Sequence, residues 1–195
     1  MSTNLIQGLS FARYSAAGAR DIRHVVEAIY RSAYADAIEA GDPFEAPDSF
    51  MHRFDAYTDP QAGRFELVVG RIDGEPVGQT WGWPLTAQSR WWTNLRLDTG
   101  DRAAFVAENG MRTFALSEIM VCKPFTGRGI ARALHDEILR TRPEERATLL
   151  VEPDNTRAYQ AYINWGWSKV GVLQPSWPNA PQLDVLIREL GNGRN

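Results

Sequence analysis

Apolar residues recur along much of this chain at three- and four-residue intervals, a spacing that predicts amphipathic helices. Such a pattern covers residues 20–40 and ends at residues 41–43, Gly-Asp-Pro, a combination that terminates helices. A second, shorter helix is predicted at residues 47–57. Further helical patterns cover residues 129–141 and 156–165.

Other segments have the composition of strands. The Asp73-Gly74 pair joins two apolar segments, 65–72 and 76–83, and predicts a tight hairpin. Residues 84–110 are polar and irregular, so we expect a loop with some local structure. The other predicted strands cover residues 11–14, 113–121, 148–151, 168–173 and 183–190.

This order of elements predicts one α/β domain over residues 1–195. Residues 113–151 follow a strand-helix-strand order, which is long enough for a right-handed parallel crossover. The hairpin at residues 65–83 requires antiparallel neighbours. We therefore expect a mixed sheet with helices on both faces.

Composition and charge argue against several classes of function. A formal net charge of −3 and a pI of about 5.7 disfavour nucleic acid or an anionic membrane as a partner. The single cysteine, Cys122, allows no intrachain disulfide or Cys-based zinc site, and the three scattered histidines suggest no metal cluster. We expect a cytoplasmic protein, because no apolar run of membrane-spanning length and no secretory signal is visible. The strong preference for arginine over lysine hints at a bacterial source.

The segment with the most chemical information, residues 118–134, is a predicted strand that passes through two glycines into a helix. Gly127 and Gly129 let the backbone approach a phosphate, and a helix N-terminus favours anions. Arg128 and Arg132 add positive charge. A Walker loop would need Lys-Ser or Lys-Thr after its last glycine, and this pair is absent here. A Rossmann fingerprint would need glycine at position 132, where this chain has arginine, so the segment matches that fingerprint weakly.

A third interpretation accounts for more of the chain. Residues 126–131, Thr-Gly-Arg-Gly-Ile-Ala, follow Val-Cys-Lys-Pro and resemble the acetyl-CoA-binding motif of the GNAT acyltransferase family, with Thr126 where Gln or Arg is usual. Residues 155–167 resemble the family's later segment, Asn-x-x-Ala-x-x-x-Tyr-x-x-x-Gly-Phe, with Trp167 in place of Phe. Both segments occur in the family's order, and the resemblance covers residues 113–172.

The resemblance implies a single GNAT-like domain with a mixed, mostly antiparallel sheet of about seven strands. It implies acetyl-CoA as co-substrate and no metal. The strand before the glycines would pair with the pantetheine, the following N–H groups would hold the pyrophosphate, and Asn155 would bond the pantetheine arm. The residues implied in acetyl-CoA binding are Ile119, Met120, Val121, Gly127, Arg128, Gly129, Ile130, Ala131, Arg132, Asn155, Ala158 and Tyr162.

Three residues are candidates for proton transfer. The resemblance implies that Tyr162 is the general acid near the departing sulfur. The alternative is a structural role, in which Tyr162 only packs its helix against the sheet. Glu118 is the candidate base, and its alternative role is that of a solvated carboxylate on a strand. Glu152 is a second candidate for the base. Strand alternation places Glu118 on the same face as Met120. Cys122 is expected to be a small buried residue and no nucleophile.

Candidates for acceptor binding come from charge and from the seven tryptophans. Trp81 and Trp83 lie two apart on one predicted strand and share a face, and Trp91 and Trp92 lie in the loop after it. If the four converge, they form an aromatic wall for an apolar, aromatic or cationic acceptor; core packing is the alternative for half or more of the tryptophans. The interval around Glu39 is acidic, so it is either a rim that attracts amines or a solvated helix end.

The leading hypothesis is an acetyl-CoA-dependent N-acetyltransferase that acts on a primary amine of a small molecule. The alternatives are a non-catalytic acyl-CoA sensor or regulatory module on the same fold and a protein or peptide N-acetyltransferase. We expect a monomer or homodimer without nucleic-acid or membrane partners. The acceptor and the acyl-chain preference are not encoded in a readable motif.

Overall fold

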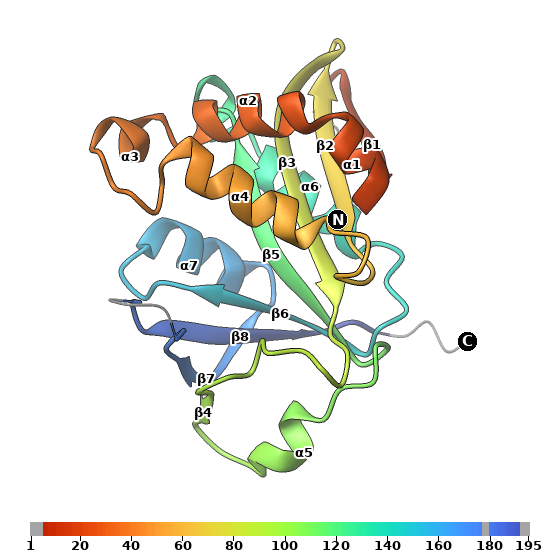
Figure 1. Cartoon of the computed structure of the whole chain (residues 1–195), viewed down its shortest axis with the longest axis vertical. Coiled ribbons are helices and arrows are strands. Elements are labelled where there is room, and N and C mark those ends of the chain that lie inside the picture. The colour runs from red at the N-terminus through yellow and green to blue at the C-terminus, as the bar shows by residue number, and fades with distance from the viewer. Residues whose placement is uncertain (1–5, 177–179, 192–195) are drawn as a thin grey trace. The chain divides into compact units, whose positions relative to one another are not determined.

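Eight strands are hydrogen-bonded in the order β1-β2-β3-β5-β6-β8-β7-β4 (Figure 1). The computed structural model describes residues 6–176 and 180–191. The chain divides into two units, one of Met1–Trp83 with Glu118–Thr141, the other of Pro84–Ser117 with Arg142–Asn195. The predicted α/β class with a mostly antiparallel sheet is confirmed, and the eighth strand is β4 (Arg96–Leu97), inside the segment predicted as a loop.

The strands of the first unit are β1 (Leu9–Ser15), β2 (Glu66–Ile72), β3 (Glu75–Pro84) and the C-terminal part of β5 (Thr113–Val121). β2 pairs antiparallel with both β1 and β3. The predicted hairpin is present at Asp73-Gly74, where both residues have positive φ angles of 50° and 90°. Two consecutive positive φ angles are typical of a type I′ turn, which fits the twist of the flanking strands.

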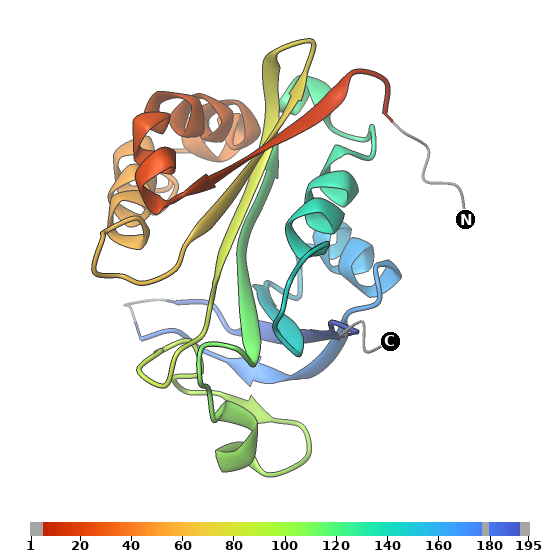
Figure 2. The ribbon, with the colours of Figure 1, turned by 90° about the vertical axis from the view of Figure 1, so that its right-hand side faces the viewer.

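Helices cover both faces of this unit's strands (Figure 2). One face carries α1 (Ala16–Asp21), α2 (Arg23–Ala33), α3 (Ala35–Glu39) and α4 (Pro47–Tyr57), and the other carries α6 (Ile130–Leu139). The single helix predicted at residues 20–40 is therefore wrong. Its breaks fall at Ile22 and Tyr34, which both leave helical geometry at φ −106°. The apolar spacing continues across both breaks, so the pattern could not show them.

A close approach of α6 to the strands explains one glycine of β3. A Cβ at Gly78 would lie 2.8 Å from Met120 O and 3.0 Å from Leu134 Cδ1. Leu134 itself is fully buried on α6. The absence of a side chain at position 78 therefore lets α6 pack against β3 and leaves the opposite face of β3 for α2 and α4.

The second unit contains the N-terminal part of β5 and the remaining strands. β6 (Arg146–Val151) pairs parallel with β5, as the predicted crossover requires, and antiparallel with β8 (Leu183–Glu189). β8 pairs antiparallel with β7 (Ser168–Leu173), and β7 pairs with β4. The helices are α5 (Arg102–Val106) and α7 (Thr156–Asn164).

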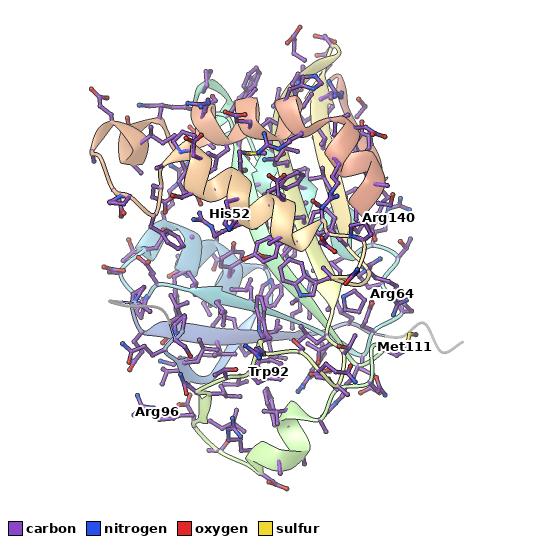
Figure 3. All side chains as sticks on the ribbon, in the orientation of Figure 1. His52, Arg64, Trp92, Arg96, Met111 and Arg140 are labelled. Carbon is purple, nitrogen blue, oxygen red and sulfur yellow. The ribbon has the colours of Figure 1, made fainter. Side chains whose placement is uncertain are left out.

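A buried polar network anchors the irregular segment 84–110 within the second unit. Arg146 Nη2 lies 3.3 Å from Glu108 Oε1, and Arg146 Nε donates to Thr113 Oγ1 at 2.8 Å. Glu108 Oε1 also accepts from Trp92 Nε1 at 3.0 Å; Trp92 is labelled in Figure 3. Removing one member of such a network leaves a buried charge unpaired, so the segment is held by more than turn propensity.

Two searches of the described residues bear on function. None of their helices is long and apolar enough to cross a membrane. Residues 6–176 and 180–191 also contain no group of three or more His, Cys, Asp or Glu side chains that could hold a metal ion.

Candidate active site

The loop between β5 and α6 exposes backbone amides at a helix N-terminus. A short 3₁₀ turn at Lys123–Phe125 precedes Gly127 and Gly129, whose φ angles are +76° and +82°. Gly129 is the N-cap residue of α6, and no side chain caps the helix there. A Cβ at Gly127 would meet nothing within 4 Å. Open space beside left-handed glycines and an uncapped N-terminus fit the approach of a pyrophosphate group.

The two arginines of this loop and helix differ in their surroundings. The Arg128 guanidinium carbon lies 5.3 Å from the centroid of the Phe125 ring, and Arg128 is exposed. Arg132 Nε forms an ion pair with Asp136 Oδ2 at 2.6 Å, one turn along α6. Arg128 therefore offers its charge to an anion at the loop, whereas the charge of Arg132 is balanced on the helix surface.

The register between β3 and β5 fixes the face on which Glu118 lies. Cys122 N donates to Val77 O at 2.9 Å, and Gln79 Nε2 lies 3.1 Å from Met120 Sδ. Val77 of β3 therefore lies opposite Cys122 of β5, and Gln79 lies opposite Met120, which is the register of an antiparallel pair. Met120 is buried in the cluster under α2 and α4, so Glu118 shares that face, as strand alternation predicts.

The same register places Glu118 opposite Trp81 of β3. Thr80 Oγ1 donates to Glu118 O at 2.7 Å, which holds this part of β5 against β3. Trp81 is 1% exposed, and the centroids of the Phe50, Phe54 and Phe65 rings lie 5.6, 5.7 and 6.1 Å from its own. Glu118 thus stands beside a dense aromatic cluster, a setting that disfavours a charged carboxylate.

Burial raises the pKa of Glu118 to about 7. Arg53 on α4 opposes this increase by favouring the carboxylate, and Glu45 adds to it by repulsion. A carboxylate with a pKa near neutrality can accept a proton and release it again at physiological pH, which is the property of a general base.

Both neighbouring charges are held by aromatic residues of the same unit. Tyr30 donates its hydroxyl to Glu45 Oε2 at 2.6 Å, and the same hydroxyl oxygen lies 2.9 Å from Glu45 O. Arg53 donates from Nη1 to Phe44 O at 2.9 Å, and its guanidinium carbon lies 4.0 Å from the centroid of the Phe44 ring. The charges that act on Glu118 therefore have fixed positions.

Trp83 lies on the same strand face as Trp81 and has a different environment. Its ring centroid lies 4.8 Å from that of Tyr57, and both residues are half-buried. Trp81 and Trp83 both contact the Phe65 ring, which agrees with their predicted shared face. Trp81 belongs to the core, and Trp83 is the one of the pair that keeps accessible ring surface.

The second unit carries the helix with Asn155 and Tyr162. Asn155 is the N-cap residue of α7, and its Oδ1 accepts from Ala158 N at 3.3 Å. Tyr162 is half-buried, with its ring centroid 5.6 Å from that of Trp165 and 6.2 Å from that of Trp167 in edge-on contacts.

Tyr159, one turn before Tyr162, has a structural contact. Its hydroxyl donates to Asp184 Oδ2 at 3.1 Å, and Lys169 Nζ lies 2.9 Å from the other oxygen of Asp184. This carboxylate is 3% exposed and needs both partners. Tyr159 is therefore tied to a strand, as a structural tyrosine would be.

The other candidates lie in simpler surroundings. Trp92 is buried in the second unit, and Trp91 in the same unit is half-buried. Glu39 is exposed at the end of α3, and Glu152 is exposed after β6. Cys122 is buried with its Sγ 3.7 Å from Pro76 O, and burial raises the pKa of the thiol, which leaves it a poor nucleophile.

Sequence analysis did not identify Tyr30, Glu45, Arg53 or Tyr57 as neighbours of Glu118. The spacing of Arg53 and Tyr57, four residues apart on α4, places them on one helix face and was the available signal. What that face meets is a strand more than sixty residues away along the chain, which no local pattern shows.

Comparisons with known proteins agree with this geometry. The model of the Acetyltransferase (GNAT) family matches residues 26–167. A protein from Desulfovibrio desulfuricans described as a GNAT-family acetyltransferase has a TM-score of 0.64 at 16% identity, with 94% of this chain and 99% of that chain covered. No curated protein sequence matches significantly.

Two further structures are similar in fold. The PaiA N-acetyltransferase from Thermoplasma acidophilum in complex with coenzyme A has a TM-score of 0.51 at 9% identity, covering 93% of this chain and 98% of that one. The ribosomal-protein-S18-alanine N-acetyltransferase from Escherichia coli has a TM-score of 0.60 at 12% identity, covering 96% and 97%. At these identities the likeness is one of fold.

Proposed function

This chain belongs to the Acetyltransferase (GNAT) family, and from that premise we propose that it transfers an acetyl group from acetyl-CoA to the primary amine of a small molecule. The observation that carries the proposal is the continuity of β5 with the glycine loop. One strand holds Glu118, whose pKa is near neutrality, and leads into a loop with two left-handed glycines before α6. A base and an anion site are thereby attached to one rigid element.

The donor end of the site is assigned to backbone groups. The N–H groups of residues 127–132 would hold the pyrophosphate, with the α6 dipole and the exposed Arg128 adding favourable charge. Backbone groups of Ile119 and Val121 would pair with the pantetheine as an added strand does, because those of Met120 face β3, on the side where Cys122 N donates to Val77 O. Acetyl-CoA supplies the activated acyl group in its thioester.

Glu118 is assigned as the base. An amine reaches the site largely as an ammonium ion and becomes nucleophilic only when it has lost a proton. Glu118 takes that proton, directly or through water, and the free amine then attacks the thioester carbon. As the nitrogen–carbon bond forms and the carbon–sulfur bond breaks, the nitrogen loses a second proton, which passes through water and replaces the proton given to the departing sulfur. The carboxylate is present above pH 7, so the reaction should slow as the pH falls through 7.

Tyr162 is assigned as the acid that donates a proton to the departing sulfur. Its edge-on contacts with Trp165 and Trp167 hold the ring in a defined orientation at the end of α7. Asn155 would bond the pantetheine through its amide N–H groups, because its oxygen already caps α7.

A small acceptor is favoured by the surroundings of Glu118. Glu118 is half-buried, and Arg53 and Tyr57 interact with it electrostatically. The Tyr57 ring packs against Trp83, so this part of the unit has limited polar surface. The Escherichia coli neighbour is named for a ribosomal protein acceptor, but its likeness at 12% identity concerns the fold alone.

The proposal is tested with acetyl-CoA and a panel of amines, amino sugars, amino acids and peptides. Acetyl-CoA should raise the Tm, and at least one small amine should trigger release of free CoA thiol. Thermal stabilisation without release by any amine would favour the non-catalytic sensor. Release with peptides alone would favour a protein acetyltransferase.

A further inference from the structure

Arg53 is a half-buried arginine whose charge has no carboxylate partner among the described residues. The arginines at the start of α2 and on α6 form ion pairs, for example Arg23 with Asp55 at 3.0 Å. Arg53 donates one hydrogen bond among the described residues, from Nη1 to Phe44 O, and its guanidinium carbon lies 4.0 and 5.8 Å from the centroids of the Phe44 and Phe50 rings. Most of the donors on its guanidinium remain available.

The position of Arg53 on α4 directs it toward the base. Tyr57 lies one turn later on the same helix face, and its ring is against Trp83. Trp81 lies opposite Glu118, and Trp83 is two residues further along β3. Trp83 therefore occupies the same face of the sheet as the Glu118 side chain, diagonally across from it. Arg53 also favours the ionised forms of both Glu118 and Tyr57, as a nearby cation must.

Aromatic side chains lie near both Arg53 and Glu118. Tyr57 and Trp83 are half-buried, and Phe44 is 45% exposed under the guanidinium. Flat rings of this kind favour an apolar or aromatic side chain at the site. The first unit thus places a base, an available cation and apolar surface together.

We propose that Arg53 binds the carboxylate of the acceptor, so that the acceptor is an amino acid with an apolar side chain whose amine faces Glu118. This rests on the proposed function and narrows its substrate class. The guanidinium takes the carboxylate through two N–H donors, and the side chain lies against Tyr57 and Trp83. A lysine would supply the charge without this planar fork.

Binding of the carboxylate also prepares the base. The carboxylate offsets the charge of Arg53 that stabilises ionised Glu118, so the affinity of Glu118 for a proton rises when the acceptor is in place. The same interaction that selects the acceptor therefore strengthens the group that deprotonates its amine.

The test compares phenylalanine with phenylalaninamide, which has the same size and no carboxylate, at saturating acetyl-CoA. In Arg53→Gln, kcat/KM for phenylalanine should fall about 10- to 100-fold relative to the unmodified protein, the worth of a charged bidentate contact. At pH 9, above the acid limb of both proteins, kcat/KM for phenylalaninamide should fall less than about threefold. Because each substrate is compared with itself, the different basicities of the two amines cancel. Arg53→Lys should be intermediate.

The control variant is Arg31→Gln, an exposed arginine of α2 that pairs with Glu27 and should change neither rate. Circular dichroism and the Tm of each variant show that it is folded. Equal losses for both substrates in Arg53→Gln, or faster transfer to carboxylate-free amines than to every amino acid, would overturn the assignment.

Failure of the proposed function would give a different result. If acetyl-CoA raises the Tm but no amine releases thiol, calorimetric titration of the CoA-loaded protein with phenylalanine decides the role of Arg53. Binding that Arg53→Gln weakens at least tenfold supports the carboxylate site without transfer. Binding that is absent, or equal in both proteins, overturns it.

Discussion

Tyr30 donates its hydroxyl to Glu45 Oε2 at 2.6 Å, and this bond fixes one of the two charges that act on Glu118. Burial raises the pKa of Tyr30, and the Glu45 carboxylate raises it further, so the phenol stays protonated and keeps donating. The other charge, Arg53, is fixed by Phe44. An anion and a cation thus act on Glu118, and their effects on its pKa oppose each other.

Opposite shifts of the pH profile follow from this arrangement. Arg53→Gln removes the group that lowers the pKa of Glu118, so the acid limb of kcat/KM should move from about pH 7 to higher pH. Glu45→Gln removes a repelling charge and should move the limb to lower pH. We expect shifts of about half to one pH unit, measured by thiol release with phenylalaninamide. Shifts in the same direction would show that these charges do not set the pKa of Glu118.

Glu118 is expected to cost stability in return for its function. Its pKa is about 7 in the folded protein, against 4.5 ordinarily, so the folded state holds the proton more tightly than the unfolded state. Stability is therefore lost as the pH rises from about 4.5 to 7. Glu118→Gln should stabilise the protein by about 1–3 kcal/mol at pH 8 and by little at pH 4.5. Denaturant titrations at both pH values measure this; a variant less stable at pH 8 would contradict it.

Alanine variants of two glycines with positive φ, one in the proposed donor site and one in a hairpin turn, test the acetyl-CoA site against a control. Gly127 and Gly74 have φ angles of +76° and +90°, and a Cβ at either position would meet nothing within 4 Å. Alanine at either position should cost about 1–2 kcal/mol of stability through backbone strain. Only Gly127→Ala should weaken acetyl-CoA binding, by about tenfold or 1.4 kcal/mol, because its methyl group occupies the space left for the pyrophosphate. Equal affinities in calorimetry would remove the loop from the donor site.

Two tyrosines of α7 should separate catalysis from structure. Tyr162→Phe should lower kcat by about 100-fold if it is the general acid, with little change in Tm. Tyr159→Phe removes the hydroxyl that donates to the buried Asp184 and should cost about 1 kcal/mol with kcat unchanged. Rate assays and thermal denaturation of both variants check this; the reverse pattern would exchange their roles.

Strong local periodicity explains which elements could be predicted from sequence. The strand at residues 113–121 and the helix at residues 47–57 match β5 and α4 because their ends carry clear signals. Strand β4 has two residues and α5 has five, too few for a period to be read. Both are held by tertiary contacts: β4 pairs with β7, and Phe105 O of α5 accepts from Arg146 Nη2 at 2.6 Å.

The candidate site divides in a similar way. Glu118 and the glycine loop could be proposed from sequence because a motif is local. Arg53 lies 65 residues before Glu118, and its role depends on which face of α4 meets β5. Counting tryptophans gave candidates, but only packing separates the buried Trp81 from the half-exposed Trp83.

The most direct test of the account is thiol release from acetyl-CoA, measured between pH 6 and 9 for the unmodified protein and Glu118→Gln. The account predicts amine-dependent release with an acid limb near pH 7 in the unmodified protein. Glu118→Gln should release thiol about 100-fold more slowly and without that limb, while acetyl-CoA raises the Tm of both proteins equally. Unchanged rate and unchanged limb in the variant would contradict the assignment of Glu118 as the base.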